Sequence, residues 1–159
     1  MRPWRRRAIL LRDLRAEDAP ALARLHGLAF HRGWGEDEFE QLLAASSSLG
    51  EAASFSRGGG LQGFVLSRIA GVEAEILSIV VDPPARRQGV ARSLLSRHLD
   101  RLRERGVREV FLEVDEGNQP ALAFYETFGL KTVGRRRGYY PRSSGGRGGA
   151  LVLRCDLDG

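Results

Sequence analysis

The segment RRQGVARSLL, Arg86 to Leu95, combines residue types that could hold an anion. Gly89 lies where an amphipathic helix begins, although glycine is a poor helix former. A glycine there lets the backbone approach a ligand closely, and the free N–H groups of a helix N-terminus favour negative charge. Arg86, Arg87 and Arg92 add guanidinium groups, which pair well with phosphate. The segment predicts a phosphate-binding loop; the alternative is an ordinary helix start with solvated arginines.

Two better-known phosphate motifs do not fit this segment. A P-loop is excluded because no Gly-Lys-Ser/Thr follows the glycine. The dinucleotide fingerprint is a poor fit because its three-glycine spacing is missing.

Glu113 and Tyr125 are the residues that could carry proton transfer. Glu113 interrupts the apolar strand VFLEV, and a strand that follows a crossover helix is expected to be buried on both faces. A buried carboxylate is costly unless it is paired or solvated, so a salt bridge to an arginine, or exposure near the strand end, is the alternative to a chemical role. Tyr125 has apolar neighbours at helical spacing, which is typical of a core residue.

The hydrophobic pattern predicts the elements that position these residues. Strands are expected over 9–14, 53–57, 61–71, 73–83, 108–115, 131–140 and 148–157, and helices over 18–29, 36–43, 89–105 and 118–129. Asp18 is expected to cap the first helix, with Leu22, Leu25, Leu28 and Ala29 on its apolar face. The order predicts an α/β (α+β) fold: a mixed, mostly antiparallel sheet of about seven strands with about four helices on its faces. The helix over 89–105 should make a right-handed parallel crossover.

Length and composition predict one domain over residues 1–159, with 1–7 as a basic tail expected to be disordered. Cys155 is the only cysteine, so an internal disulfide and a cysteine metal cluster are excluded, and the cytoplasm is the expected compartment. No apolar run is long enough to cross a membrane, and Arg12 and Asp13 interrupt the apolar stretch that a signal peptide would need.

The net charge is +5, and almost all of the positive charge is arginine. That balance suits a phosphate-bearing ligand, a nucleic acid or a partner embedded in RNA. The alternative is a coding sequence that favours arginine. No metal is expected, because His26, His31 and His98 show no matching carboxylate pattern.

The segment SIVVDPPARRQGVARSLL resembles the acetyl-CoA-binding motif of the GNAT superfamily of N-acetyltransferases, which is Arg/Gln-x-x-Gly-x-Gly/Ala after a strand. LEVDEGNQPALAFYETFGL resembles the second motif of that superfamily, and the resemblance runs from about Ile9 to Leu157. It implies that acetyl-CoA is the acetyl donor, with its pantetheine arm on the strand backbone and its pyrophosphate on the loop. The implied cofactor-binding residues are Ile79, Val80, Val81, Arg86, Arg87, Gln88, Gly89, Val90, Ala91, Arg92 and Asn118.

Within the superfamily the chain is most similar to the ribosomal-protein-alanine N-acetyltransferase (RimI-like) group. That resemblance implies that Glu113 is the general base and Tyr125 the general acid. AFHRGWGEDEF and RRRGYYP resemble segments near the acceptor site of that group, which implies substrate-binding roles for Trp34, Tyr139 and Tyr140. In these segments Gly35 replaces a serine and Gly138 an asparagine of the group, and both changes concern the acceptor rather than CoA.

The expected function is acetyl transfer to the α-amine of a protein N-terminus, ribosomal in the implied case, by direct attack in a ternary complex. A backbone N–H of the 79–81 segment, unpaired where the strands separate, is expected to stabilise the oxyanion. A small amine or a lysine side chain is the alternative acceptor. A basic nucleic-acid-binding module is the alternative of another class, although a nucleic acid is not expected as the direct substrate. A silent acetyl-CoA sensor is disfavoured by Glu113 and Tyr125.

Overall fold

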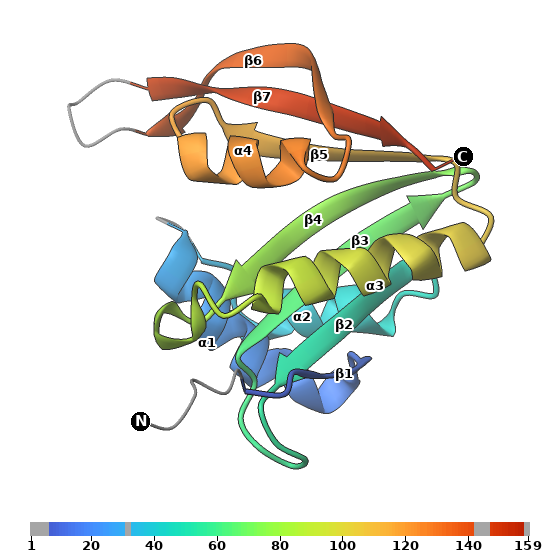
Figure 1. Cartoon of the computed structure of the whole chain (residues 1–159), viewed down its shortest axis with the longest axis vertical. Coiled ribbons are helices and arrows are strands. Elements are labelled where there is room, and N and C mark those ends of the chain that lie inside the picture. The colour runs from blue at the N-terminus through green and yellow to red at the C-terminus, as the bar shows by residue number, and fades with distance from the viewer. Residues whose placement is uncertain (1–6, 31–32, 142–146, 158–159) are drawn as a thin grey trace, which may run out of the picture.

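The structure is a computed structural model that describes residues 7–30, 33–141 and 147–157, with the side chains of 138–147 outside the description. Apart from Arg7, the basic tail expected over 1–7 lies outside these residues, as does His31. The elements are β1 (Leu10–Asp13), α1 (Ala19–Ala29), α2 (Glu36–Ala44), β2 (Ser48–Ser54), β3 (Gly63–Ala70), β4 (Glu73–Val81), α3 (Val90–Glu104), β5 (Glu109–Asp115), α4 (Gln119–Glu126), β6 (Lys131–Pro141) and β7 (Arg147–Asp156), as Figure 1 shows. Short 3₁₀ turns lie at Ala16–Asp18 and Pro83–Ala85.

The strands form one mixed sheet of seven in the order β1-β2-β3-β4-β5-β7-β6. Neighbouring strands are antiparallel except β4 and β5, which are parallel and are connected through α3. The predicted mixed, mostly antiparallel sheet with helices on its faces is therefore confirmed.

Helices cover both faces of the sheet (Figure 1). The larger apolar cluster joins α3 and α4 to β2, β3, β4, β5 and β7, and the smaller joins α1 and α2 to the opposite face of β2, β3 and β4. The amphipathic pattern of α3 explains its docking, since the side chains facing the sheet are all buried: Leu94, Leu95, His98, Leu99 and Leu102.

Three sequence predictions about the N-terminal half are wrong. The strand expected over 53–57 is Ser48–Ser54, because small residues without clear alternation pair with β1 and β3 and are buried in the sheet. On α1, Leu28 and Ala29 are exposed, and His26 takes the buried position one turn after Leu22. Asp18 precedes α1 but makes no side-chain cap, because its carboxylate binds the Arg12 guanidinium instead.

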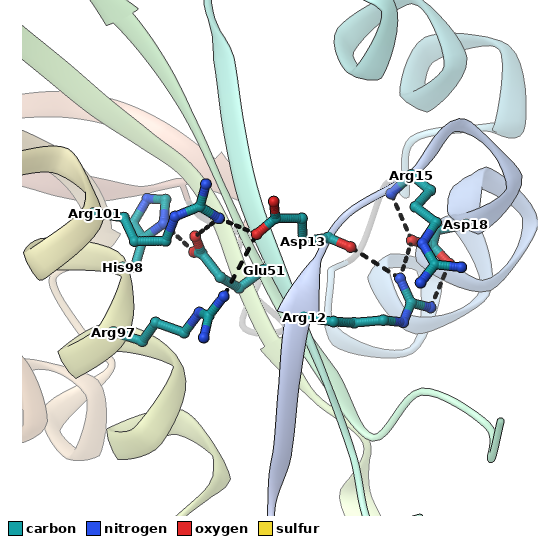
Figure 2. A network of polar contacts seen from close by, with 8 residues as sticks. All are labelled: Arg12, Asp13, Arg15, Asp18, Glu51, Arg97, His98 and Arg101. Atoms are coloured by element: carbon teal, nitrogen blue, oxygen red, sulfur yellow. Dashed lines mark hydrogen bonds and ion pairs between the residues drawn. The ribbon is translucent and has the colours of Figure 1, made fainter. Parts of the chain in front are cut away.

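A buried network of hydrogen bonds and ion pairs connects α3 to the N-terminal strands β1 and β2 (Figure 2). Glu51 of β2 and His98 of α3 are fully buried and hydrogen-bonded through His98 Nδ1, while Arg101 reaches Glu51 Oε1 at 3.0 Å and also pairs with Asp13. His98 Nε2 lies 2.5 Å from the Oγ of Ser67 on β3. Ser67, His98 and Glu51 are hydrogen-bonded in the order found in a hydrolase triad. All three side chains are completely buried, however, so a substrate has no access to them. The network therefore positions α3.

Candidate active site

The site is built around a separation of β4 and β5. Their parallel ladder runs from Glu73 and Glu109 to Ile76 and Leu112 and then stops. Beyond that point residues 79–81 pair with β3 on one side only, and residues 113–115 pair with β7. Within the described residues, the backbone edge of 79–81 that faces β5 therefore has no ladder partner, as expected from the sequence where the strands separate.

A bulge in β4 lies at the end of this ladder. Leu66 pairs with Ser78, and Ser67 pairs with Ile76, so Leu77 is an extra residue without a partner in the register. A bulge bends its strand and increases the local twist. It therefore turns β4 away from β5 where the gap begins.

The N-terminus of α3 has the backbone geometry of an anion cradle. Gly89 is the N-cap with φ of +84°, a left-handed conformation that favours glycine. A Cβ built there would meet only Ile9 Cδ1 at 4.0 Å, so conformation rather than crowding demands glycine and the approach is open. Arg87 also has a positive φ, of 64°. The first-turn N–H groups of a helix have no intrahelical partners, so the loop fits a phosphate group.

The polar side chains of the loop are fixed by local contacts. Arg86 Nε donates to the carbonyl of Val81 at 3.3 Å, and Gln88 Nε2 donates to the carbonyl of Pro84 at 3.2 Å. Arg92 donates to Thr127 Oγ1 at 3.2 Å. Its guanidinium also lies over the Phe128 ring, 5.1 Å from the centroid. Arg92 thus connects the first turn of α3 to the end of α4 across the gap.

Glu113 opens into a pocket of about 320 Å³ on the face of β5 that points away from α4. Its side chain is 18% exposed, and Arg136 NH1 of β6 lies 3.1 Å from its Oε1. The salt bridge considered from the sequence is therefore present, yet the carboxylate still reaches the pocket. The expectation that β5 is buried on both faces is wrong: Val110, Leu112 and Val114 are buried, whereas the residues that alternate with them are only half-buried.

Tyr125 and Asn118 belong to α4. Tyr125 is 9% exposed and lies in the apolar cluster between the helices and the sheet. Asn118 is the N-cap, with Oδ1 accepting the N–H of Ala121 at 3.2 Å, and asparagine is among the residues preferred there. Because α4 and the Glu113 side chain are on opposite faces of β5, the two candidate catalytic groups lie on either side of the sheet and are not brought into direct contact.

Trp34 is held against α1. Its backbone N–H donates to His26 Nδ1 at 3.0 Å, and its ring stacks on the imidazole at 4.5 Å. Burial lowers the pKa of His26 to about 4, so the ring is neutral at pH 7 and its Nδ1 can accept this bond. A Cβ at Gly33 would lie 2.8 Å from the Cα of Gly27, so glycine permits the close packing. Tyr139 and Tyr140 lie on β6, with side chains outside the described part.

The described residues hold neither a reactive cysteine nor a metal cluster. Cys155 is buried in β7, and burial raises the pKa of its thiol, so a nucleophilic thiolate is disfavoured. Across residues 7–30, 33–141 and 147–157 there is no group of three or more His, Cys, Asp or Glu arranged to hold a metal. The helices found in the same residues are too short or too polar to span a membrane.

The seven-stranded sheet, the strand gap and the glycine at the start of α3 are the features that the resemblance to the GNAT acetyltransferases predicted. The chain belongs to the Acetyltransferase (GNAT) family, whose model matches residues 12–130, and the family uses acetyl-CoA.

The chain is 33% identical to the [ribosomal protein bS18]-alanine N-acetyltransferase of Escherichia coli (strain K12) over 144 residues, 89% of this chain and 93% of that protein. The crystal structure of the ribosomal-protein-S18-alanine N-acetyltransferase from Escherichia coli superposes with a TM-score of 0.86 at 30% identity, covering 94% of both chains. Arabidopsis thaliana NAA60 in complex with acetyl-CoA gives 0.83 at 22% identity, covering 96% of this chain and all of that one, and shows a shared fold.

Three residues near the site were not singled out from the sequence. Arg136 was one of many arginines, and only the β6–β7 register brings it to Glu113. His26 could have been found from the sequence, because it lies one helical turn after Leu22 and therefore on the face of α1 that is buried. The sequence pointed to Ser78 more weakly, since it is the single polar residue within the run ILSIVV.

Proposed function

We propose that this GNAT acetyltransferase transfers the acetyl group of acetyl-CoA to the α-amine of a protein N-terminus. The observation that carries the proposal is the position of Glu113. It is the first residue of β5 past the end of the β4–β5 ladder, and its carboxylate opens into a pocket on one face of the sheet. The E. coli relatives, which act on the alanine of a ribosomal protein, favour a ribosomal acceptor.

In this proposal the donor lies along the gap. The backbone of Ile79, Val80 and Val81 pairs with the pantetheine arm, because its edge toward β5 carries no ladder. Residues 86–92 hold the pyrophosphate at the N-terminus of α3, where unpaired N–H groups and arginines favour an anion. Asn118 caps α4 through Oδ1, which leaves its amide nitrogen to serve the arm.

The chemistry needs one base and one acid. An α-amine has a pKa of about 7.7–8.0 and must lose a proton before it attacks the thioester. Glu113 takes that proton, directly or through water, on the pocket face. An unpaired backbone N–H of residues 79–81 donates to the oxyanion. Tyr125, on the opposite face of the sheet, donates the proton that the departing CoA thiolate needs. The second proton lost by the attacking nitrogen as the amide forms restores the Tyr125 hydroxyl through solvent, and no enzyme-bound acetyl group forms.

Trp34, Tyr139 and Tyr140 are assigned to the acceptor. Trp34 is fixed by His26 on the α1–α2 side, which is also the face that carries the Glu113 pocket. Tyr139 and Tyr140 extend β6 beyond Arg136, the residue that pairs with Glu113. Aromatic side chains suit the walls of a narrow slot around an extended peptide. A cytoplasmic location remains a prediction from the single cysteine.

Thiol release with acetyl-CoA and a panel of short peptides tests the proposal. The panel holds peptides beginning with alanine, serine or methionine, and a blocked peptide with an internal lysine. Turnover is expected only with free N-termini, and Glu113→Gln should lower kcat by about 10²–10⁴-fold, the usual contribution of a general base. Tyr125→Phe should also lower kcat.

Near-normal kcat in both variants across pH would contradict the assigned roles. Turnover of small amines or lysine alone would move the acceptor to the alternative class. RNA binding without any acetyl-CoA turnover would favour the nucleic-acid module.

A further inference from the structure

Ser78 is a buried polar residue without a visible structural task. Its side chain belongs to β4, and the residue is 4% exposed. No hydrogen-bond partner for its Oγ lies among the residues that the structure describes. The only other buried side-chain atom of this kind in the same residues is Arg97 Nε, whose guanidinium already pairs with Asp13. A buried hydroxyl without a partner carries a desolvation cost, which a ligand can offset.

The β4 bulge determines where this hydroxyl points. In a regular strand Glu75 and Ser78, three residues apart, would lie on opposite faces. The extra residue Leu77 shifts the alternation of side chains along β4 by one residue. The side chain of Ser78 therefore lies on the same face of the sheet as that of Leu66, its partner in the register. Leu66 belongs to the cluster under α1 and α2. Ser78 therefore faces the side of the sheet onto which Glu113 opens.

Ser78 and Glu113 also lie at the same point along the gap. The β4–β5 ladder ends at Ile76 and Leu112. Glu113 is the next residue of β5, and Ser78 follows the bulged Leu77 in β4. The two side chains are thus the first polar groups on this face beyond the ladder, one from each strand that flanks the opening.

We propose that Ser78 is an acceptor-binding residue whose Oγ accepts a hydrogen bond from the amino group that Glu113 deprotonates. The inference rests on the proposed function. After losing its proton a primary amine keeps two N–H bonds, and its lone pair must face the thioester carbon. An oxygen acceptor for one N–H fixes that direction, and orientation of this kind is a large part of enzymatic rate enhancement. Glu113 supplies the base on one side of the gap and Ser78 the second polar contact on the other.

Substitution of Ser78 separates this role from a structural one. Ser78→Ala removes an unpartnered hydroxyl, so the melting temperature should stay the same or rise. The kcat/KM for a free N-terminal peptide should fall about ten-fold, the loss expected for one substrate hydrogen bond. The Kd for acetyl-CoA, measured by calorimetry, should not change. Threonine and valine are both branched at Cβ and have nearly the same shape, but only threonine keeps the hydroxyl of Ser78. Ser78→Thr should therefore retain peptide turnover, and Ser78→Val should not.

Ser67→Ala is the matched control. Ser67 is a buried serine of the neighbouring strand that faces α3 and lies 2.5 Å from His98 Nε2. Its removal should lower the melting temperature and leave the peptide kcat/KM unchanged. The opposite responses of Ser67→Ala and Ser78→Ala distinguish a structural hydroxyl from one that serves the substrate.

Wild-type peptide kinetics in Ser78→Ala would overturn the inference while leaving the proposed function intact. An equal loss of acetyl-CoA affinity would also overturn it, since the hydroxyl would then serve the donor. Equal activity of the threonine and valine variants would do the same. If the wild-type enzyme turns over no free N-terminus but binds acetyl-CoA, the proposed function fails, and this inference fails with it.

Discussion

Gly89 and Gly106 make a matched pair of perturbations at the two ends of α3. Both residues have φ of +84°, and a Cβ at either would cause no clash, with Ile9 Cδ1 at 4.0 Å from Gly89 and nothing within 4 Å of Gly106. Substitution by alanine therefore costs only the left-handed backbone conformation, about 1–2 kcal/mol at each position. For a chain of 159 residues this corresponds to a loss of about 2–8 °C in melting temperature.

The two substitutions should differ in acetyl-CoA binding. In Gly89→Ala, a change in φ that relieves the backbone strain turns N–H groups at the N-terminus of α3 away from the proposed pyrophosphate position. Gly106 lies beyond the C-terminus of α3, so the same change there leaves these N–H groups in place. A hydrogen bond to a charged group is worth about 1.5–3 kcal/mol. Loss of one such bond in Gly89→Ala should raise the acetyl-CoA Kd by about 10–100-fold. Gly106→Ala should keep the wild-type Kd.

Calorimetric titration of both variants, with melting curves on the same samples, measures the difference. Similar melting temperatures would show that the two variants are equally stable. A difference between their acetyl-CoA Kd values would then reflect the binding site rather than general destabilisation. An unchanged Kd in Gly89→Ala, or equal weakening in both variants, would refute the assignment of the pyrophosphate to this helix end.

Three further predictions concern buried groups. Because the folded pKa of His26 is about 4 and the unfolded value 6.5, its contribution to stability is complete above pH 6.5 and is lost as pH falls toward 4. Urea titrations should show a loss of about 2 kcal/mol between pH 6.5 and 5 that is absent in His26→Gln, and an equal slope in that variant would contradict the assignment. Glu51→Ala leaves the buried ends of His98 and Arg101 without their carboxylate and should cost about 3–5 kcal/mol in denaturant unfolding; a loss below about 1 kcal/mol would show that the network is dispensable. Cys155→Ala should keep kcat within about two-fold, since a thiol with a burial-raised pKa takes no part in a direct transfer, and a large loss of kcat would instead indicate a covalent intermediate.

The sequence predicted the elements that have a strong periodic signal. The α3 helix and the β3–β4 hairpin were found because apolar spacing and turn glycines identify them locally. The β2 strand was misplaced because small residues carry little strand signal and only pairing with two neighbours makes it a strand.

Much of the candidate site depends on contacts between segments far apart in the chain. Gly89 and Glu113 could be selected from motif spacing alone. The pairing of Glu113 with Arg136 depends on the order β5-β7-β6, and the direction of Ser78 depends on a bulge of one residue. A single-residue change in register moves a side chain to the other face, and no local pattern encodes it.

The proposed acceptor is tested most directly with one peptide that carries both a free N-terminal alanine and an internal lysine. The peptide is incubated with the enzyme and acetyl-CoA, and the acetylated nitrogen is located by fragmentation mass spectrometry. Acetylation of the α-nitrogen alone, abolished in Glu113→Gln, is the result predicted by a carboxylate that opens into the pocket beside the strand gap. Acetylation of the lysine, or an unchanged rate in the variant, would contradict it.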